Sequence, residues 1–346
     1  MSLPSWADYV AALGNVFSGI ATLFLLALLG WLAVRRKILS DAGVDGVTRL
    51  LVDLVVPAKI ITAFLAGLDG RTLDKVGAVV LAMLVLLGFG LAVAWLATRL
   101  WRGKRAAEDR ALLALSASQN GVYLPLPLML AITPAALHNE ATILIGGVFL
   151  VLAATQWTLV VCLLRGEAER DAARENWRAA LLAPLNGPVL GVLVGCLLAF
   201  FPPLADAARS DAPPPWLAVP LGAATLLGDA MPPLAMIVLG MMIGRCEVRG
   251  SLSWRDVVVP CAVRFVLTPL LFVWMLGWGP FEWASPLMAV ALIIQAAAPP
   301  GTNLSLIARR YGGDWETVSS VLLVTYTVGL FVVPAWAALF MPALGE

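Results

Sequence analysis

Apolar stretches of about 20 residues recur along the whole 346-residue chain, and each is long enough for a helix to cross about 30 Å of hydrocarbon. The polar connections between the stretches are too short to hold a soluble domain. The sequence therefore predicts an all-α integral membrane protein with ten transmembrane helices. The ten expected spans are 15–34, 47–67, 76–98, 111–132, 141–164, 179–201, 217–243, 257–278, 286–308 and 317–341.

Composition supports this class and excludes others. Hydrophobic residues make up 61% of the chain and charged residues 13%, against roughly 25% charged in soluble domains. A net charge of +1 gives no basic field for nucleic acid. The four cysteines form no CxxC pair and the chain has a single histidine, so we expect no metal site, disulfide framework or cofactor. No GxxxxGK[ST] run is present, which disfavours ATP-driven transport by this chain alone.

Basic residues are concentrated in alternate loops. If the N-terminus is outside, 18 of the 23 Lys and Arg residues lie in or beside the five inner loops. Three lie in outer loops, and Lys59 and Arg264 lie within spans. This asymmetry is the positive-inside pattern. It predicts a multi-pass protein of the cell (inner) membrane with both termini outside.

The chain aligns with itself at an offset of 176 residues, which makes the second and seventh spans counterparts, and likewise the fourth and ninth. The aligned pairs are Asp53 and Asp229, Pro57 and Pro233, Gln119 and Gln295, and Glu140 and Glu316. Each repeat then has five spans, and because five is odd the second repeat must lie upside down, as in many transporters. We expect a first repeat at 1–164, a cytoplasmic linker at 165–178 and a second repeat at 179–346. Chance alignment of a leucine-rich sequence is the alternative.

The fourth and ninth spans contain helix breakers at matched depths, in SASQNGVYLPLPLML and IIQAAAPPGTNLSL. Backbone groups freed inside a membrane need protein or a water-filled cavity as partners, and paired breaks in two halves indicate a transporter's binding site. Helices that restart after a break direct N–H groups into the cavity, which favours an anionic substrate. Ordinary proline kinks are the alternative. The candidate substrate-binding residues are Gln119, Asn120, Tyr123, Pro125, Pro127, Gln295, Pro299, Pro300, Thr302 and Asn303.

Aspartates precede prolines in two other spans. Asp53 precedes Pro57, and Asp229 precedes Pro232 and Pro233, and we expect these prolines to break the second and seventh spans. A charge at the bilayer centre costs at least ~2.5–3.5 kcal/mol. The two aspartates must therefore face a cavity, be paired, be protonated or lie near an interface, and any of these makes them candidate proton-coupling residues.

Two basic side chains also lie within spans. Lys59 is near the middle of its span, and we interpret it as a third proton-coupling residue that pairs in turn with Asp53 and with the substrate. Arg264 begins only about eight residues into the eighth span. For Arg264 we expect snorkelling toward the inner surface.

Three longer stretches, in this order and spacing, carry a resemblance to a known family. They are LLGWLAVRRKILSDAGVDGVTRLLVDLVVPAKII, NGVYLPLPL and PPGTNLSLIARRYGGDWETVSSVLLVTYTVGLFVVPAW. With them the chain resembles the auxin efflux carrier family, within the wider group that shares the bile-acid symporter fold. The resemblance implies two inverted five-helix repeats, with a scaffold domain and a transport domain each drawn from both. It also implies that the unwound fourth and ninth helices cross at their prolines and bind a substrate carboxylate there.

The expected function is secondary transport of a small organic anion, such as a dicarboxylate, by alternating access coupled to protons. Sodium coupling through unwound carbonyls and the Gln119 and Gln295 amides is an alternative within the same class. From other classes, a membrane-embedded enzyme acting on a lipid-linked substrate, and a channel or sensor, remain open. The expected partners are the anion, the lipid bilayer and, as one assembly that such a carrier could form, a second copy of the chain.

Overall fold

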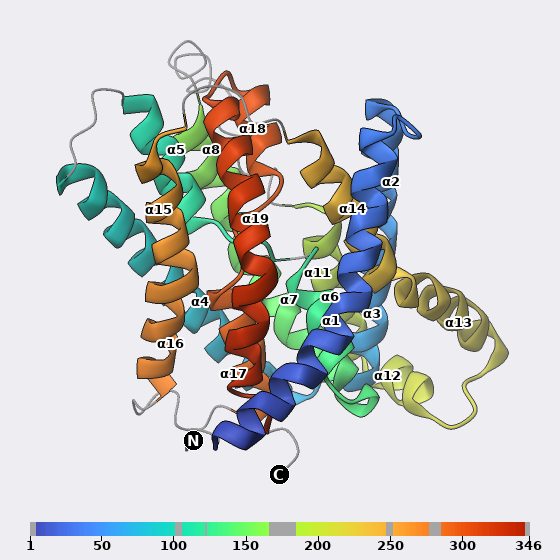
Figure 1. Cartoon of the computed structure of the whole chain (residues 1–346). Coiled ribbons are helices and arrows are strands. Elements are labelled where there is room, and N and C mark those ends of the chain that lie inside the picture. The colour runs from blue at the N-terminus through green and yellow to red at the C-terminus, as the bar shows by residue number, and fades with distance from the viewer. Residues whose placement is uncertain are drawn as a thin grey trace.

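The computed structural model describes residues 5–100, 106–121, 123–165, 185–246, 252–276 and 285–342, and these ranges form an all-helical bundle without β-strands (Figure 1). The first half comprises α1 (Trp6–Arg35), α2 (Asp41–Leu50), α3 (Val56–Gly67), α4 (Gly70–Leu100), α5 (Ala106–Ala117), α6 (Pro125–Ile132), α7 (His138–Thr155) and α8 (Val161–Leu164). The second half comprises α11 (Gly187–Ala199), α12 (Pro202–Arg209), α13 (Pro215–Asp229), α14 (Met231–Arg245), α15 (Trp254–Ala262), α16 (Thr268–Leu276), α17 (Pro286–Ala296), α18 (Leu304–Arg310) and α19 (Trp315–Ala338). Apart from its first residue, the expected linker at 165–178 lies outside the described ranges.

Seven of the described helical segments are long and apolar enough to cross a membrane, or up to eight if the pair α11 and α12, bent by 94°, is one span. The seven overlap seven of the ten expected spans, and the bent pair overlaps part of the expected span 179–201, whose residues 179–184 lie outside the described ranges. The other two expected spans, 111–132 and 286–308, are each divided into two shorter helices, α5 with α6 and α17 with α18. The breaks expected in these two segments are therefore present.

The two chain ends lie at the same end of the bundle, and α18 lies at the opposite end (Figure 1). Side chains such as Leu25, Leu197 and Leu226 are more than 60% exposed on the outside of the bundle. Because hydrocarbon solvates such side chains well, this surface fits a protein embedded in lipid.

Two helix pairs pack especially closely, and glycines make the close approach possible. A Cβ on Gly240 of α14 would lie 1.7 Å from the carbonyl oxygen of Ala27 on α1. A Cβ on Gly191 of α11 would lie 2.8 Å from the Cα of Pro57 on α3. Small residues allow backbones in a membrane to approach and gain dispersion contacts. As a result, α1 of the first half packs on α14 of the second, and α11 packs on α3.

The break expected at Pro57 is wrong, because α2 and α3 belong to one continuous helical segment, whereas the break expected at Pro232 and Pro233 is present, because Ala230 separates α13 from α14. Pro57 lies in the first turn of α3 and follows a π-helical turn, Leu51–Val55 (η1), whose wider spacing accommodates the proline ring. Pro232 and Pro233 lie in the first turn of α14, where a missing N–H costs little. Pro57 therefore does not unwind its helix, whereas Pro232 and Pro233 begin a new one.

Candidate functional site

The two broken segments meet and pair with each other. Gln119 and Pro300 form an isolated antiparallel β-bridge. The N–H of Asn120 donates to the carbonyl of Pro299 (2.8 Å), and the N–H of Gly301 donates to the carbonyl of Ser118 (3.2 Å). Each break therefore satisfies backbone groups that the other leaves free, as a chain inside a membrane requires.

A tyrosine from a third element fixes this crossing. The Tyr326 hydroxyl, on α19, donates to the carbonyl of Pro300 (3.0 Å) and accepts from Nδ2 of Asn120 (2.6 Å). Oδ1 of Asn120 in turn accepts from the N–H of Tyr123 (3.0 Å). The Asn120 side chain is thus engaged in holding the crossing together.

A cavity of about 240 Å³ lies against the crossing, close to the lower end of the range typical of small-molecule sites. Its polar lining consists of five amide side chains and three hydroxyl groups, and none of the described lining residues carries a charge. The polar residues are Gln119, Asn120, Gln156, Asn186 and Asn303, with Thr48, Tyr123 and Thr302. The lining comes from both halves of the chain, which makes the cavity a candidate binding site between them.

Asn303 and Gln156 form the best donor group in this cavity. Nε2 of Gln156 donates to Oδ1 of Asn303 (2.9 Å), which orients that amide and leaves its two N–H donors for a ligand. Gln156 lies in a π-helical turn, Gln156–Val160 (η3), that continues α7. Sequence reasoning missed Gln156, although an amide inside the apolar stretch 141–164 was a usable signal.

The predicted binding residues divide into two groups. Gln119, Asn120, Tyr123, Thr302 and Asn303 line the cavity. The remaining five lie outside its lining: Pro125, Pro127, Gln295, Pro299 and Pro300. Pro299 and Pro300 serve through their carbonyls, which accept the hydrogen bonds of the crossing.

The helices that restart after the breaks are poor sources of N–H donors. α6 has eight residues, and the prolines at its first and third positions, Pro125 and Pro127, have no N–H. α18 has seven residues. The macrodipole argument for an anion is therefore weaker than the sequence suggested, and side-chain amides are the main donors.

The expectation that Arg264 snorkels to the surface is wrong. Arg264 lies in a π-helical turn, Val263–Leu267 (η4), and its side chain is 0% exposed. Nε donates to the carbonyl of Ala298 (2.9 Å) and Nη2 to the carbonyl of Gln295 (2.8 Å), both at the end of α17. The guanidinium therefore binds backbone carbonyls inside the bundle instead of extending to the membrane surface.

A wide vestibule of about 1,040 Å³ opens beside the cavity, and Leu306 lines both spaces. Five basic and two acidic side chains line the vestibule, namely Arg35, Lys37, Arg245, Arg309 and Arg310, with Asp41 and Asp45. Both acids pair with Arg245, at 3.2 Å and 2.6 Å. The excess positive charge attracts anions toward the cavity.

The candidate proton-coupling residues Asp53, Lys59 and Asp229 are not among the lining residues of the cavity or of the vestibule. Nζ of Lys59, on α3, pairs with Oδ1 of Asp229 at 2.9 Å, so its partner here is Asp229 and not Asp53. The Lys59 side chain is 12% exposed and that of Asp229 is 61% exposed. Asp53 is exposed and follows Val52, which lines the cavity.

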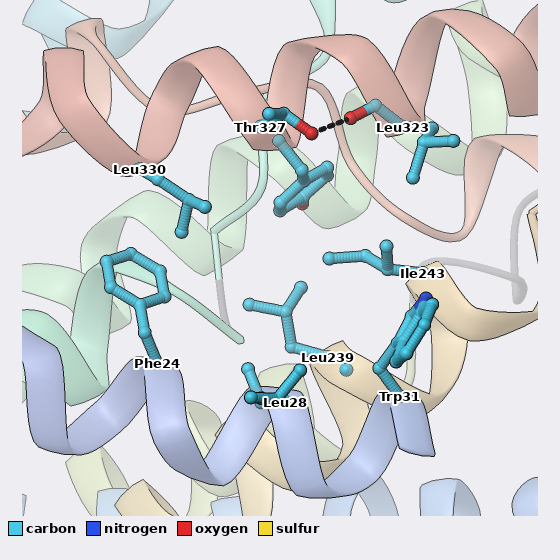
Figure 2. A pocket seen from close by; sticks show the side chains of 11 residues that line it. Phe24, Leu28, Trp31, Leu239, Ile243, Leu323, Thr327 and Leu330 are labelled. Carbon is cyan, nitrogen blue, oxygen red and sulfur yellow. Dashed lines mark hydrogen bonds between the residues drawn. The ribbon is translucent and has the colours of Figure 1, made fainter. Parts of the chain in front are cut away.

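A second, apolar pocket of about 320 Å³ lies between α1, α14 and α19. Figure 2 shows Phe24, Leu28 and Trp31 of α1 opposite Leu323 and Leu330 of α19. The ring of Tyr326 also lines this pocket, while its hydroxyl reaches the crossing. The pocket therefore borders the element that fixes the site.

The model of one protein family, described as membrane transport protein, matches residues 15–337, which is nearly the whole chain. The chain belongs to this family. The match confirms the resemblance to the auxin efflux carriers, and the membrane transport protein family is a transporter family and not an enzyme family.

Similar proteins of this membrane transport family come from Arabidopsis thaliana. The chain is 26% identical to Protein PIN-LIKES 5 over 170 residues, covering 47% of this chain and 41% of that protein. It is 28% identical to Protein PIN-LIKES 3 over 122 residues (34% and 31%), and 30% identical to Protein PIN-LIKES 4 over 126 residues (34% and 30%). The chain thus spans less than half the length of these relatives. Family membership, the apolar helices and the continuous spans together describe a multi-pass membrane transport protein.

Proposed function

We propose that this chain is a secondary transporter that moves a small organic anion, such as a carboxylate, by alternating access. The observation that carries the proposal is the uncharged amide cavity at the crossing, whose lining includes Asn303 with its Oδ1 already bonded to Gln156. Charge-assisted hydrogen bonds from amides to a carboxylate are stronger than those between neutral groups. A carboxylate needs such donors, and no acidic side chain among the described lining residues repels it.

The basic vestibule supports the same substrate class. Its excess of arginine and lysine raises the local concentration of anions, and the shared residue Leu306 places it next to the cavity. The vestibule is the substrate's approach from the inner side, and the amide cavity is where the carboxylate binds.

For the architecture, we propose ten spans arranged as two inverted five-helix repeats, 1–164 and 179–346. The packing supports this. At the offset of 176 residues α1 corresponds to α11 and α14 corresponds to α3, so the contact of α1 with α14 has its counterpart in the contact of α11 with α3. The scaffold domain then contains these four elements, and the transport domain contains the two crossing segments.

We also propose that both termini face outside and that the carrier lies in the cell (inner) membrane. The distribution of basic residues supports this orientation. In a Cys-free background, a single cysteine at His138 should react with an impermeant thiol reagent added outside, and one at Lys37 should not. Reversed labelling would contradict the orientation. A homodimer stays a prediction.

For coupling, we propose protons, with Asp53, Lys59 and Asp229 as the ionisable groups. The Lys59–Asp229 pair joins α3 to α13, and Asp53 follows Val52, a lining residue of the cavity. Protonation of Asp53 during substrate binding would link the two events. Asp53→Asn should then abolish the dependence of uptake on an imposed pH gradient while leaving some downhill exchange. An intact pH response would leave the aspartate with a structural role.

Sodium coupling is the alternative that a specific observation favours, because Oε1 of Gln119 and of Gln295 are buried and have no partner among the described residues. Sodium-dependent uptake into proteoliposomes would decide for it. A channel would show flux that neither saturates nor runs uphill. An enzyme acting on a lipid-linked substrate would turn over its substrate in detergent.

The direct test is ligand-dependent thermal stability of the purified protein, screened against monocarboxylates and dicarboxylates. We expect at least one carboxylate to raise the unfolding midpoint of the wild type. Asn303→Leu should abolish that shift, since it removes both donors but keeps a similar volume. Thr327→Val, on the apolar pocket, is the matched control and should keep the shift. A shift that survives Asn303→Leu would refute binding at the crossing.

A further inference from the structure

Arg264 is a buried charge without a carboxylate partner among the described residues. Its side chain is 0% exposed, and the ion pairs in the described part of the chain do not include it. Removing one charge from water without compensation is strongly unfavourable. What compensates the guanidinium is a set of backbone carbonyls at the end of α17, together with the negative end of that helix's dipole.

Five of the carbonyls around this break accept hydrogen bonds from side chains or from the other break. Those of Gln295 and Ala298 accept from Arg264, and that of Ala296 accepts from Oγ1 of Thr268 (2.8 Å). Those of Pro299 and Pro300 accept from the N–H of Asn120 and from the Tyr326 hydroxyl. In transporters with broken helices, freed carbonyls and half-helix C-terminal ends are the ligands that coordinate a coupling cation. In this chain, side chains and the partner break already occupy five of them.

We infer that Arg264 is a tethered cation that permanently holds the end of α17 in the place of a bound monovalent ion. The guanidinium supplies the positive charge and two directed hydrogen bonds, which shape the crossing from the side away from the cavity. Arg264 is therefore a positioning residue, since it does not line the cavity and acts through the crossing.

The inference also bears on sodium coupling. A sodium ion at the backbone carbonyls of Gln295 and Ala298 would lie beside the guanidinium that bonds to them, and like charges repel. These carbonyls are thus poor sodium ligands while Arg264 is present. Where it concerns coupling, this step rests on the proposed transport function, and it argues against sodium at the end of α17 only.

The test is chemical rescue of Arg264→Ala, read as the thermal unfolding midpoint of the full-length protein in detergent without substrate. The midpoint should fall by several degrees in choline chloride. It should recover in part with about 10 mM guanidinium chloride, far below denaturing concentrations, and with sodium chloride at the same strength. The wild type should unfold at the same temperature in all three salts.

Arg209→Ala is the matched control. Nε and Nη2 of Arg209 donate to the carbonyls of Leu65 (3.0 Å) and Leu68 (2.8 Å) at the end of α3, the same pattern as at Arg264, but this arginine is exposed. Water replaces those bonds, so the control should lose little stability and gain nothing from guanidinium. An Arg264→Ala variant that behaves like this control, or whose midpoint is no higher in guanidinium chloride than in choline chloride, would overturn the tethered cation.

If Arg264→Ala does not fold, Arg264→Lys and Arg264→Gln carry the test. Lys keeps the charge, whereas Gln keeps only hydrogen-bond donors, so Lys should be the more stable variant and equal stability would overturn the inference. These measurements need no substrate, so they test the role of Arg264 independently of the proposed function. Failure to find a carboxylate ligand would refute the proposed function alone. If a carboxylate does bind, its affinity for the wild type should not change between sodium and choline.

Discussion

Removing the hydroxyl group of Tyr326 is the sharpest test of the crossing, because this one group bonds to both breaks. Tyr326 is 5% exposed, and its hydroxyl lies 3.0 Å from the carbonyl of Pro300 and 2.6 Å from Nδ2 of Asn120. Tyr326→Phe keeps the ring in the apolar pocket and deletes only these two hydrogen bonds. The change therefore isolates the polar contribution.

A buried polar group that loses its partner costs about 1–3 kcal/mol, and the Pro300 carbonyl alone accounts for that amount. If the loss falls on the binding geometry, it corresponds to a roughly 5- to 150-fold weaker affinity for the carboxylate. If it falls on the fold, the unfolding midpoint drops by several degrees. Thermal unfolding with and without the carboxylate separates the two outcomes.

Tyr9→Phe is the matched control for this experiment. The Tyr9 hydroxyl donates to the carbonyl of Ala335 at 3.4 Å, near the limit of a hydrogen bond, in a partly buried position. Its loss should change the midpoint by much less and leave carboxylate affinity unchanged. If Tyr326→Phe matched Tyr9→Phe in both measurements, the crossing would not depend on this clamp.

Three further substitutions test other parts of the structure. Gln156→Glu keeps the shape of the side chain but places a negative charge in the cavity, so it should abolish the carboxylate-induced thermal shift, and a retained shift would place the anion elsewhere. Gly228→Ala puts a Cβ 2.9 Å from the Cα of Lys59, which should push α13 away from α3, reduce the stability by about 1–3 kcal/mol and lower the unfolding midpoint. The control is Gly222→Ala, whose Cβ would have nothing within 4 Å and should not destabilise the protein. Equal effects of the two substitutions would exclude the contact. The backbone N–H of Thr72, in the first turn of α4, donates to Asp69 and holds the pKa of that carboxyl below its ordinary 3.8. The contribution of this hydrogen bond to the stability is therefore complete at pH 7 and is lost as the pH falls through the lowered pKa. Asp69→Asn does not titrate, so its midpoint should fall less than that of the wild type between pH 6 and pH 3, and parallel curves would refute the assignment.

The sequence could predict where the helices break but not what satisfies the breaks. Proline, glycine and amides in SASQNGVYLPLPLML and IIQAAAPPGTNLSL are local signals, so the positions of both interruptions followed from them. The partners of the freed carbonyls come from distant elements, and Thr268 and Tyr326 carry no local mark of that role. Long-range pairing of this kind depends on how the helices pack.

The two basic residues within spans show the same limit. Counting residues to the membrane surface predicted snorkelling for Arg264, but such a count ignores the carbonyls at the end of α17. Lys59 pairs with Asp229, 170 positions away, because Gly228 lets the end of α13 approach the α3 backbone. Asp53 is closer to Lys59 in sequence, but close sequence position did not decide the partner.

The division of hydrogen bonds at the crossing indicates which contacts an alternating-access step would have to break. The strong bonds of the two breaks go to each other, to η4 through Arg264, to α19 through Tyr326 and to η3 through Asn303. Toward α14, the hydrogen bond of the crossing is that of Thr302, whose Oγ1 donates to Sδ of Met242 at 3.2 Å, and a thioether is a weak acceptor. A step in which the crossing moved with η3, η4 and α19 would therefore break only this weak hydrogen bond toward α14, but it would also have to release the packing of α6 on α14. The cavity lies at that weak boundary, where Thr48, Asn186 and Met242 face the amides of the crossing, so a ligand bound there contacts both bodies and can bias their relative position.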